Sequence, residues 1–175
     1  RPGTYELMDE ALRLGVETVG GLDPCGIEQD PVRHLESVFG LAVKHGRGVD
    51  IHLHDLGTQG LWQVGRIVDF TARHGLEGRV MISHAFCLGC VHWDQVAPLA
   101  DRLARHGVAI MTTAPADCPA PPVRQLRAAG VTVCSGNDGI RDAWSPFGNG
   151  DQLERALFVA LRFDWRRDED LAVAF

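Results

Sequence analysis

The side chains best suited to catalysis in this sequence stand at or just after the ends of three short apolar segments. They are His52, His54 and Asp55 in the first, His84 in the second and Asp138 in the third. Imidazole and carboxylate groups bind divalent metal ions and also transfer protons. Because the carboxyl ends of parallel strands line one edge of an α/β sheet, these side chains are expected to meet there. The sequence therefore favours a metal-assisted hydrolase.

Each of these residues also has a purely structural interpretation. His52 and His54 lie on the same side of a strand, yet a single histidine there is as readily a hydrogen-bonded core residue. His84 alone would fit a surface imidazole, and Asp138 lies in an Asn-Asp-Gly sequence that is typical of turns and helix caps. Asp55 strengthens the functional interpretation, because a carboxylate at a strand end can orient an imidazole or move a proton.

A repeated helix–strand pattern is expected to position these residues. Helix-like segments end in Gly, often with Lys, Arg or His just before it, and an apolar segment follows each time. Strands are predicted at 17–22, 49–53, 80–83, 108–113 and 131–135, without strict alternation, as for strands covered on both faces. Helices are predicted at 5–14, 32–44, 61–74, 93–106, 123–129 and 152–162. Such βα units build either a barrel or a doubly wound sheet.

Composition narrows the functional class. The chain has 175 residues and a formal net charge of −6 with acids and bases interspersed, so nucleic acid is not an expected partner. No apolar run approaches the roughly 20 residues of a membrane span, so we expect no membrane-spanning helix, and we likewise expect no signal peptide. Five scattered cysteines argue against a disulfide framework, which predicts a reducing, cytoplasmic location. Cys87 and Cys90 lack a second C-x-x-C pair for zinc, so both are expected to pack in a loop.

From the two ends of the chain, we expect this sequence to be part of a longer polypeptide. The sequence starts at Arg1 without Met and stops at Phe175 in a charge-rich, helix-like segment. No linker or low-complexity tract divides it. We therefore expect residues 1–175 to form a single partial catalytic barrel domain, truncated at both ends.

The segments that carry these residues resemble the cytosine deaminase-like branch of the amidohydrolase superfamily. They are, in order, residues 49–52, 83–85, 134–138 and 142–144. The resemblance covers nearly the whole chain. It implies an α/β fold, a partial TIM (β/α)8 barrel of the metal-dependent hydrolase type, with this chain supplying parallel strands four to eight and their helices. It also implies that a first pair of metal ligands lies on a strand that precedes Arg1.

The resemblance implies a role for each candidate residue. His52 and Asp138 would bind the metal ion, and Asp138 would also take a proton from the attacking water. His84 would polarise that water or the substrate. Asp55 stands where these deaminases usually carry a Glu that passes a proton to the ring nitrogen, and Trp144 matches a residue that helps wall the substrate pocket.

The implied activity is hydrolytic deamination of a cytosine-like nitrogen heterocycle with one divalent ion, Zn²⁺ or Fe²⁺. Asp55 is one methylene shorter than Glu, and Asn137 stands where a His often precedes the catalytic Asp, so the ring is left open. A cyclic amide or an aminotriazine is the alternative substrate, and a catalytically inactive fragment is a further alternative. The segment 21–24 lacks the Lys of two-metal relatives, which favours one metal. The expected partners are a small-molecule substrate and, in a homo-oligomer, other copies of the full-length chain. A membrane is not an expected partner.

Overall fold

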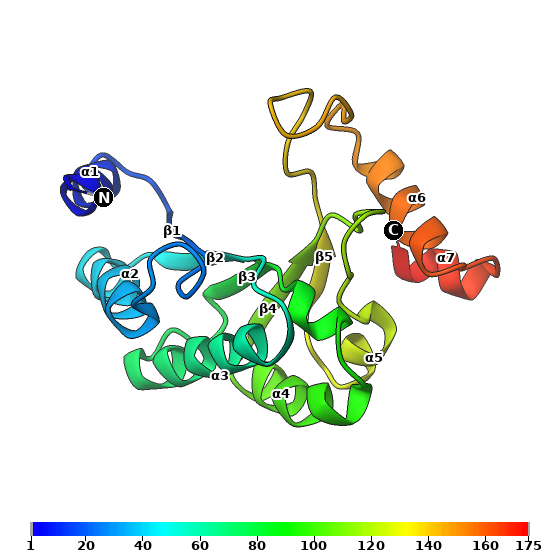
Figure 1. Ribbon diagram of the computed structural model, residues 1–175, viewed down its shortest axis with the longest axis horizontal. Coiled ribbons are helices and arrows are strands. Elements are labelled where there is room, and N and C mark those ends of the chain that lie inside the picture. The colour runs from blue at the N-terminus through cyan, green and yellow to red at the C-terminus, as the bar shows by residue number, and fades with distance from the viewer. Residues whose placement is uncertain (1, 175) are drawn as a thin grey trace.

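Five parallel strands form a single sheet in the computed structural model, which describes residues 2–174 (Figure 1). The strands are β1 Thr18–Leu22, β2 Gly48–Leu53, β3 Val80–His84, β4 Val108–Thr112 and β5 Val133–Ser135. They follow one another across the sheet in sequence order. A doubly wound sheet would reverse its strand order at a switch point, whereas a barrel adds each strand to the same side. The strand order therefore favours a barrel over a doubly wound sheet, and the parallel pairing confirms the predicted α/β class.

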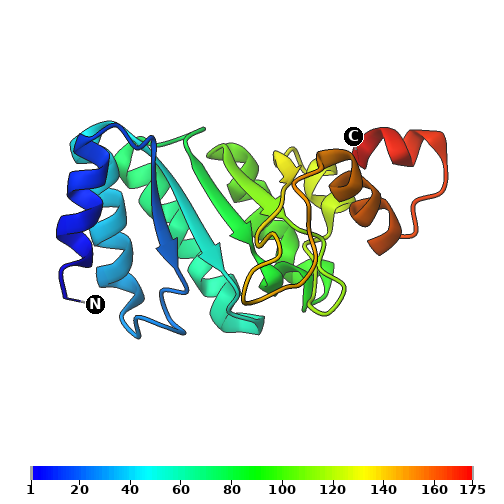
Figure 2. The same ribbon diagram turned by 90° about the horizontal axis from the view of Figure 1, so that it is seen from above.

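The helices are α1 Thr4–Arg13, α2 Pro31–His45, α3 Gly57–His74, α4 Trp93–Arg105, α5 Val123–Ala128, α6 Gln152–Arg162 and α7 Asp168–Ala174, with a short 3-10 turn η1 at Phe86–Gly89. Helices α2 to α5 connect successive strands, α1 precedes the first strand, and α6 and α7 follow the last one. Figures 1 and 2 show α2, α3 and α4 side by side along one face of the sheet, with α6 and α7 beyond β5. Among residues 2–174, no helix is long and apolar enough to cross a lipid bilayer.

Alternation along β2 separates the core from the open face of the sheet. Val49, Ile51 and Leu53 are buried against the helices, whereas Asp50 and His52 are only half-buried on the opposite side. The strands were predicted to be covered on both faces. Within residues 2–174, helices cover β2 on one face, and its other face is only half-buried. The main hydrophobic core lies on the helix side of the sheet. Helices and strands both contribute large side chains with no more than 2% exposure, among them Phe39, Ile67, Ile82, Leu103 and Ile110.

Glycine ends two helices as predicted. Gly46 after α2 and Gly75 after α3 have φ angles of 65° and 64°, a left-handed conformation that only glycine adopts without strain. The start of α3 was predicted one turn too late, because Gly57 and Gly60 have low helix propensity. Gly60 is required by packing, since a Cβ atom there would lie 2.2 Å from the Asp55 carbonyl oxygen.

The carboxyl ends of the strands carry strained backbone. Asp23 after β1, His84 and Ala85 at the end of β3, and Ala114 after β4 have φ angles of 39°, 72°, 46° and 48°. Non-glycine residues rarely adopt such angles, and those that do collect at functional sites, where the surrounding structure holds them. The strained positions lie at the edge of the sheet to which the sequence assigned the chemistry.

Candidate active site

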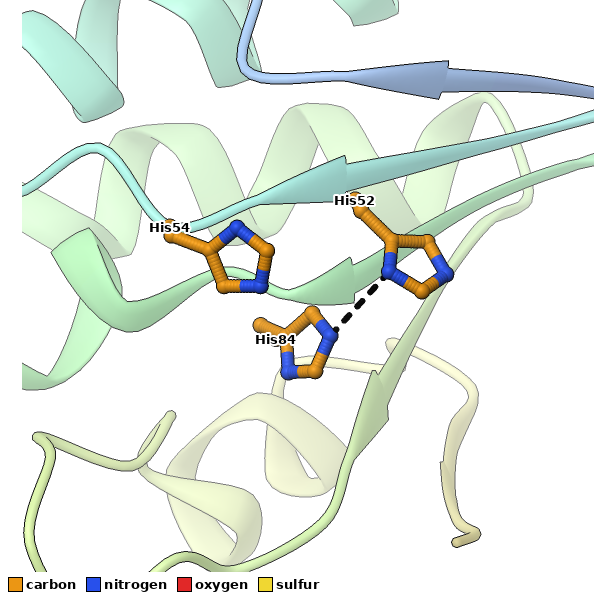
Figure 3. Close-up of side chains that lie close together, drawn as sticks. All are labelled: His52, His54 and His84. Atoms are coloured by element: carbon orange, nitrogen blue, oxygen red, sulfur yellow. Dashed lines mark hydrogen bonds between the residues drawn. The ribbon is translucent and has the colours of Figure 1, made fainter. Parts of the chain in front are cut away.

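Three imidazoles meet at the carboxyl ends of β2 and β3 (Figure 3). His52 lies in β2, His54 follows the strand, and His84 is the last residue of β3. One nitrogen atom from each ring lies within 4.8 Å of those of the others. The parallel register pairs Leu53 with His84, so the β3 imidazole lies between the two from β2. The ring centroids of His54 and His84 are 4.4 Å apart, and those of His52 and His84 are 4.9 Å apart.

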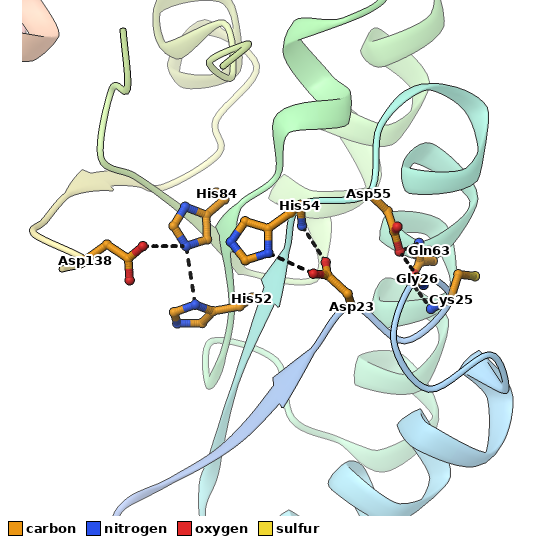
Figure 4. Close-up of polar contacts among 9 residues, drawn as sticks. All are labelled: Asp23, Cys25, Gly26, His52, His54, Asp55, Gln63, His84 and Asp138. Atoms are coloured by element: carbon orange, nitrogen blue, oxygen red, sulfur yellow. Dashed lines mark hydrogen bonds and ion pairs between the residues drawn. The ribbon is translucent and has the colours of Figure 1, made fainter. Parts of the chain in front are cut away.

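Asp138 reaches the same cluster from beyond β5. Its Oδ2 atom lies 3.8 Å from Nε2 of His84, and its side chain remains 54% exposed (Figure 4). The same Nε2 atom of His84 lies 3.3 Å from Nδ1 of His52. The structure therefore brings together His52, His84 and Asp138, which the sequence placed at or just after the ends of three apolar segments.

His84 is held in its neutral form. Burial, together with the neighbouring His54 and His52, lowers its pKa to about 4, although Asp138 opposes the shift. Its Nδ1 atom is buried and has no hydrogen-bond partner among the described residues. A neutral imidazole offers a lone pair to a metal ion without first losing a proton.

His54 is paired with a residue to which the sequence analysis gave no role. Its backbone N–H donates to Oδ1 of Asp23 at 2.6 Å, and its ring Nδ1 lies 2.9 Å from Oδ2 of the same carboxylate. The hydrogen bond to Asp23 raises the pKa of His54. Burial alone would raise the pKa of Asp23, but the bonds from His54 outweigh it and lower that pKa. Such a carboxylate fixes the orientation and tautomer of an imidazole, here one that faces His84.

Asp23 carried only a weak signal in the sequence. It follows the apolar strand β1 in Gly21-Leu22-Asp23-Pro24, the position of a metal or proton group, but nothing in the local sequence links it to His54. His54 was visible as the second member of a His-x-His pair.

Two predicted site residues lie apart from the histidines. Oδ2 of Asp55 accepts hydrogen bonds from the N–H of Gly26 at 3.0 Å and from Nε2 of Gln63 at 2.8 Å. Figure 4 shows Asp55 on the far side of Asp23 from the three imidazoles. Trp144 is 92% exposed in the segment after β5, so its predicted contact with a substrate stays a prediction. The geometry therefore departs from the role predicted for Asp55.

Of the two C-x-x-C cysteines, Cys87 packs as predicted, whereas Cys90 does not. Cys87 is buried in η1, and burial raises its pKa to about 12, so its thiol is inert at neutral pH. Cys90 is exposed at the end of the same turn, and both thiols are free.

The cluster fits a divalent metal ion. Two nitrogen ligands of one tetrahedral zinc, each at about 2.0–2.1 Å from the metal, lie about 3.3 Å from each other. The Nε2 atom of His84 and the Nδ1 atom of His52 have this separation, 3.3 Å. The Asp138 carboxylate beside them completes a nitrogen and oxygen donor set that suits Zn²⁺ or Fe²⁺.

Comparison with known proteins gives one family and several relatives. The sequence profile of the amidohydrolase family matches residues 1–167. The chain is 34% identical over 170 residues to N-isopropylammelide isopropyl amidohydrolase of Pseudomonas sp. strain ADP. The aligned region covers 95% of this chain and 41% of that protein. The chain is also 35% identical over 167 residues to the uncharacterized protein YahJ of Escherichia coli strain K12, with 95% of this chain and 36% of that protein covered.

Solved structures agree with this assignment. The crystal structure of N-isopropylammelide isopropylaminohydrolase from Burkholderia multivorans ATCC 17616 has 50% sequence identity and a TM-score of 0.97, over 99% of this chain and 45% of that chain. The 5-methylcytosine deaminase from Klebsiella pneumoniae shares the fold with a TM-score of 0.82 at 22% identity, over 99% of this chain and 48% of its own. The chain thus spans less than half the length of the relatives it matches.

Proposed function

Because this chain belongs to the amidohydrolase family, we propose that it forms the part of a metal-dependent hydrolase that cleaves carbon–nitrogen bonds of a nitrogen heterocycle. Its five parallel strands are part of the (β/α)8 barrel of such hydrolases. The observation that carries the proposal is the convergence of His52, His84 and Asp138 at one sheet edge, with His54 beside them.

His52 and Asp138 are the proposed metal ligands, as the family resemblance implies. We add His84, because its Nε2 atom has the ligand spacing relative to His52 and its low pKa keeps it unprotonated. When bound, a divalent ion supplies Lewis acidity, which makes water nucleophilic near neutral pH. The half-exposed carboxylate of Asp138 lies where it can accept the proton that this water loses.

His54 is the proposed proton donor to the leaving nitrogen, in place of Asp55. Asp23 holds the Nδ1 side of the His54 ring, which directs Nε2 toward the cluster. The raised pKa of His54 increases the fraction of rings that carry a second proton near neutral pH. A group with such a pKa both accepts and releases a proton during turnover.

The relatives favour one substrate class over the other. The two named for N-isopropylammelide are 34% and 50% identical to this chain, whereas the 5-methylcytosine deaminase is 22% identical and supports the fold alone. An amino- or alkylamino-substituted triazine is therefore the first candidate. A cytosine-like pyrimidine is the second, favoured by the motif order of residues 49–52, 83–85 and 134–138.

Amine release tests the proposal. The native-length protein, loaded with Zn²⁺ or Fe²⁺, is incubated with N-isopropylammelide or with cytosine, and isopropylamine and ammonia are quantified. We expect product from at least one substrate, none with His52→Ala, and unchanged product with the control His92→Ala, an exposed imidazole outside the cluster. Absence of product from both substrates in a fully metal-loaded protein would sink the proposal.

A further inference from the structure

Two carboxylates tie the loops after β1 and β2 to each other in opposite directions (Figure 4). Asp23, on the β1 loop, accepts hydrogen bonds from the backbone and the ring of His54 on the β2 loop. Asp55, on the β2 loop, accepts from the backbone N–H of Gly26 on the β1 loop at 3.0 Å. The backbone N–H of Asp23 also donates to the carbonyl of His52 at 3.0 Å. The two loops are therefore linked on both sides of the His54–Asp23 pair.

Gln63 completes this link from α3. It is fully buried, its Oε1 atom accepts from the N–H of Cys25 at 3.0 Å, and its Nε2 atom donates to Oδ2 of Asp55 at 2.8 Å. Asp55 and Gln63 thus bind two consecutive backbone N–H groups of the β1 loop, those of Cys25 and Gly26. A buried amide whose donor and acceptor are both satisfied fixes the groups that it joins.

Two glycines approach Asp55 closely. A Cβ atom at Gly26 would lie 2.6 Å from Oδ1 of Asp55, and one at Gly60 would lie 2.2 Å from its carbonyl oxygen. Glycine at positions 26 and 60 therefore lets the β1 loop and the start of α3 approach Asp55 from two sides. The half-buried carboxylate faces the loop that it binds and is turned away from the histidines.

Asp23 needs such support. Its φ angle of 39° is a conformation that non-glycine residues rarely hold without help from their surroundings. The bonds to Cys25 and Gly26 fix the chain directly after it. Without them, the β1 loop would be free to relax, and the Asp23 carboxylate would no longer be held against the His54 ring.

We propose that Asp55 and Gln63 are positioning residues, which hold segment 23–26 so that Asp23 keeps the ring proton of neutral His54 on Nδ1. The purpose of this arrangement rests on the proposed function, in which His54 is the proton donor. Asp55 thereby acts on the reaction through Asp23 and His54 and carries no proton to the substrate itself.

The test reads the tautomer of His54 rather than activity. Protein labelled with ¹⁵N at histidine is kept metal-free with a chelator at a fixed, alkaline pH, and long-range ¹H–¹⁵N spectra report which ring nitrogen carries the proton. We expect the Nδ1–H form of His54 in the wild type and in the control Asp94→Asn, an exposed carboxylate at the start of α4. Asp23→Asn should change the spectrum toward the tautomer mixture of a free imidazole.

Asp55→Ala is expected to reproduce most of the Asp23→Asn change, and to add nothing in an Asp23→Asn background. Gly26→Ala should act similarly, because its Cβ atom displaces the Asp55 carboxylate without removing it. Where Asp55→Ala fails to fold, the isosteric Asp55→Asn takes its place and decides the result. An unchanged His54 tautomer in the folded Asp55 and Gly26 variants would overturn the proposal. A wild type with the expected tautomer but no amine release would instead count against the proposed function alone.

Discussion

The Nε2 atom of His84 lies 3.3 Å from Nδ1 of His52, although the two residues are 32 positions apart in the sequence. The parallel register of β2 and β3 brings them together, because Leu53 is paired with His84 at the end of the ladder. Neither side chain needs a long reach. Their spacing is set by the neighbouring strands, which are among the most rigid parts of an α/β fold.

Replacement of either histidine is expected to remove metal affinity. His52→Ala and His84→Ala each delete one nitrogen ligand, so the dissociation constant for Zn²⁺ should rise by roughly 100-fold or more. Isothermal titration calorimetry on the native-length protein measures this change. His92→Ala serves as control, since its ring is exposed and pairs with Asp94. Wild-type affinity in the His84 variant would return that residue to the role of polarising water, without metal contact.

Asp23→Asn should slow turnover and spare the metal. The amide no longer stabilises the protonated His54 ring, and proton transfer of this kind contributes typically 10²–10⁴-fold to a rate. We expect kcat to fall by roughly 10²-fold while metal content, measured by atomic absorption, stays at the wild-type level. Asp94→Asn is the matched control. A fully active Asp23→Asn enzyme would show that His54 does not need its carboxylate partner.

Acid should weaken the contact between α1 and α2. Hydrogen bonds from His45 and from Lys44 lower the pKa of Asp9 below its ordinary value of 3.8. A depressed carboxylate pKa stabilises the fold above the ordinary value, and this contribution is lost as the pH falls through the folded-state pKa. Asp9→Asn should therefore lower the free energy of unfolding at neutral pH but not at about pH 2.

Urea titrations at both pH values measure the difference, with Glu17→Gln as an exposed control. An Asp9→Asn penalty of equal size at both values would mean that packing, rather than charge, holds α1 on α2.

The core below the site should be sensitive to truncation. Ile82 has no exposed surface and lies in β3, two residues before His84 in the sequence. Ile82→Ala is expected to lower the free energy of unfolding by roughly 2–5 kcal/mol, because it removes buried apolar surface and leaves a cavity. Denaturant unfolding followed by circular dichroism gives the value. Ile140→Ala, at a half-exposed position, should change stability little, and a similar loss in both variants would contradict the burial argument.

Residues 1–175 expressed alone are expected to bind metal weakly and to release no amine. The chain spans less than half the length of its relatives, and β1 and β5 have one strand partner each within residues 2–174. An open sheet with two free edges cannot enclose a substrate as a closed barrel does. Product formation by this segment at the rate of the native-length protein would contradict the expectation.

The sequence predicted the helix–strand order well because strong local signals mark it. Gly46 ends α2 and Gly75 ends α3, each directly after basic residues, and an apolar segment rich in β-branched residues follows each glycine. The meeting of His52, His84 and Asp138 was predictable too, because parallel strands end at the same edge. These inferences used rules that hold over a few residues or for any parallel sheet.

The positions of Asp55, Asp23 and Trp144 depended on more than such rules. Strand alternation places position 55 opposite positions 52 and 54, but the resemblance to a family Glu outweighed this signal. The role of Asp23 requires knowledge that β1 and β2 are neighbours, which no local pattern supplies. Trp144 lies in an irregular segment whose path is set by the Asp142 turn rather than by periodicity.

The alternation of β2 also offers a route for altering this protein by design. Asp50 and His52 face the open side of the sheet, while their neighbours Val49 and Ile51 are anchored among the helices. Recognition of a new ring can therefore be sought at Asp50, with the proposed metal ligand His52 kept, and thermal tolerance can be improved separately at the odd-numbered positions. One short strand thus offers separate positions for adjusting recognition and stability.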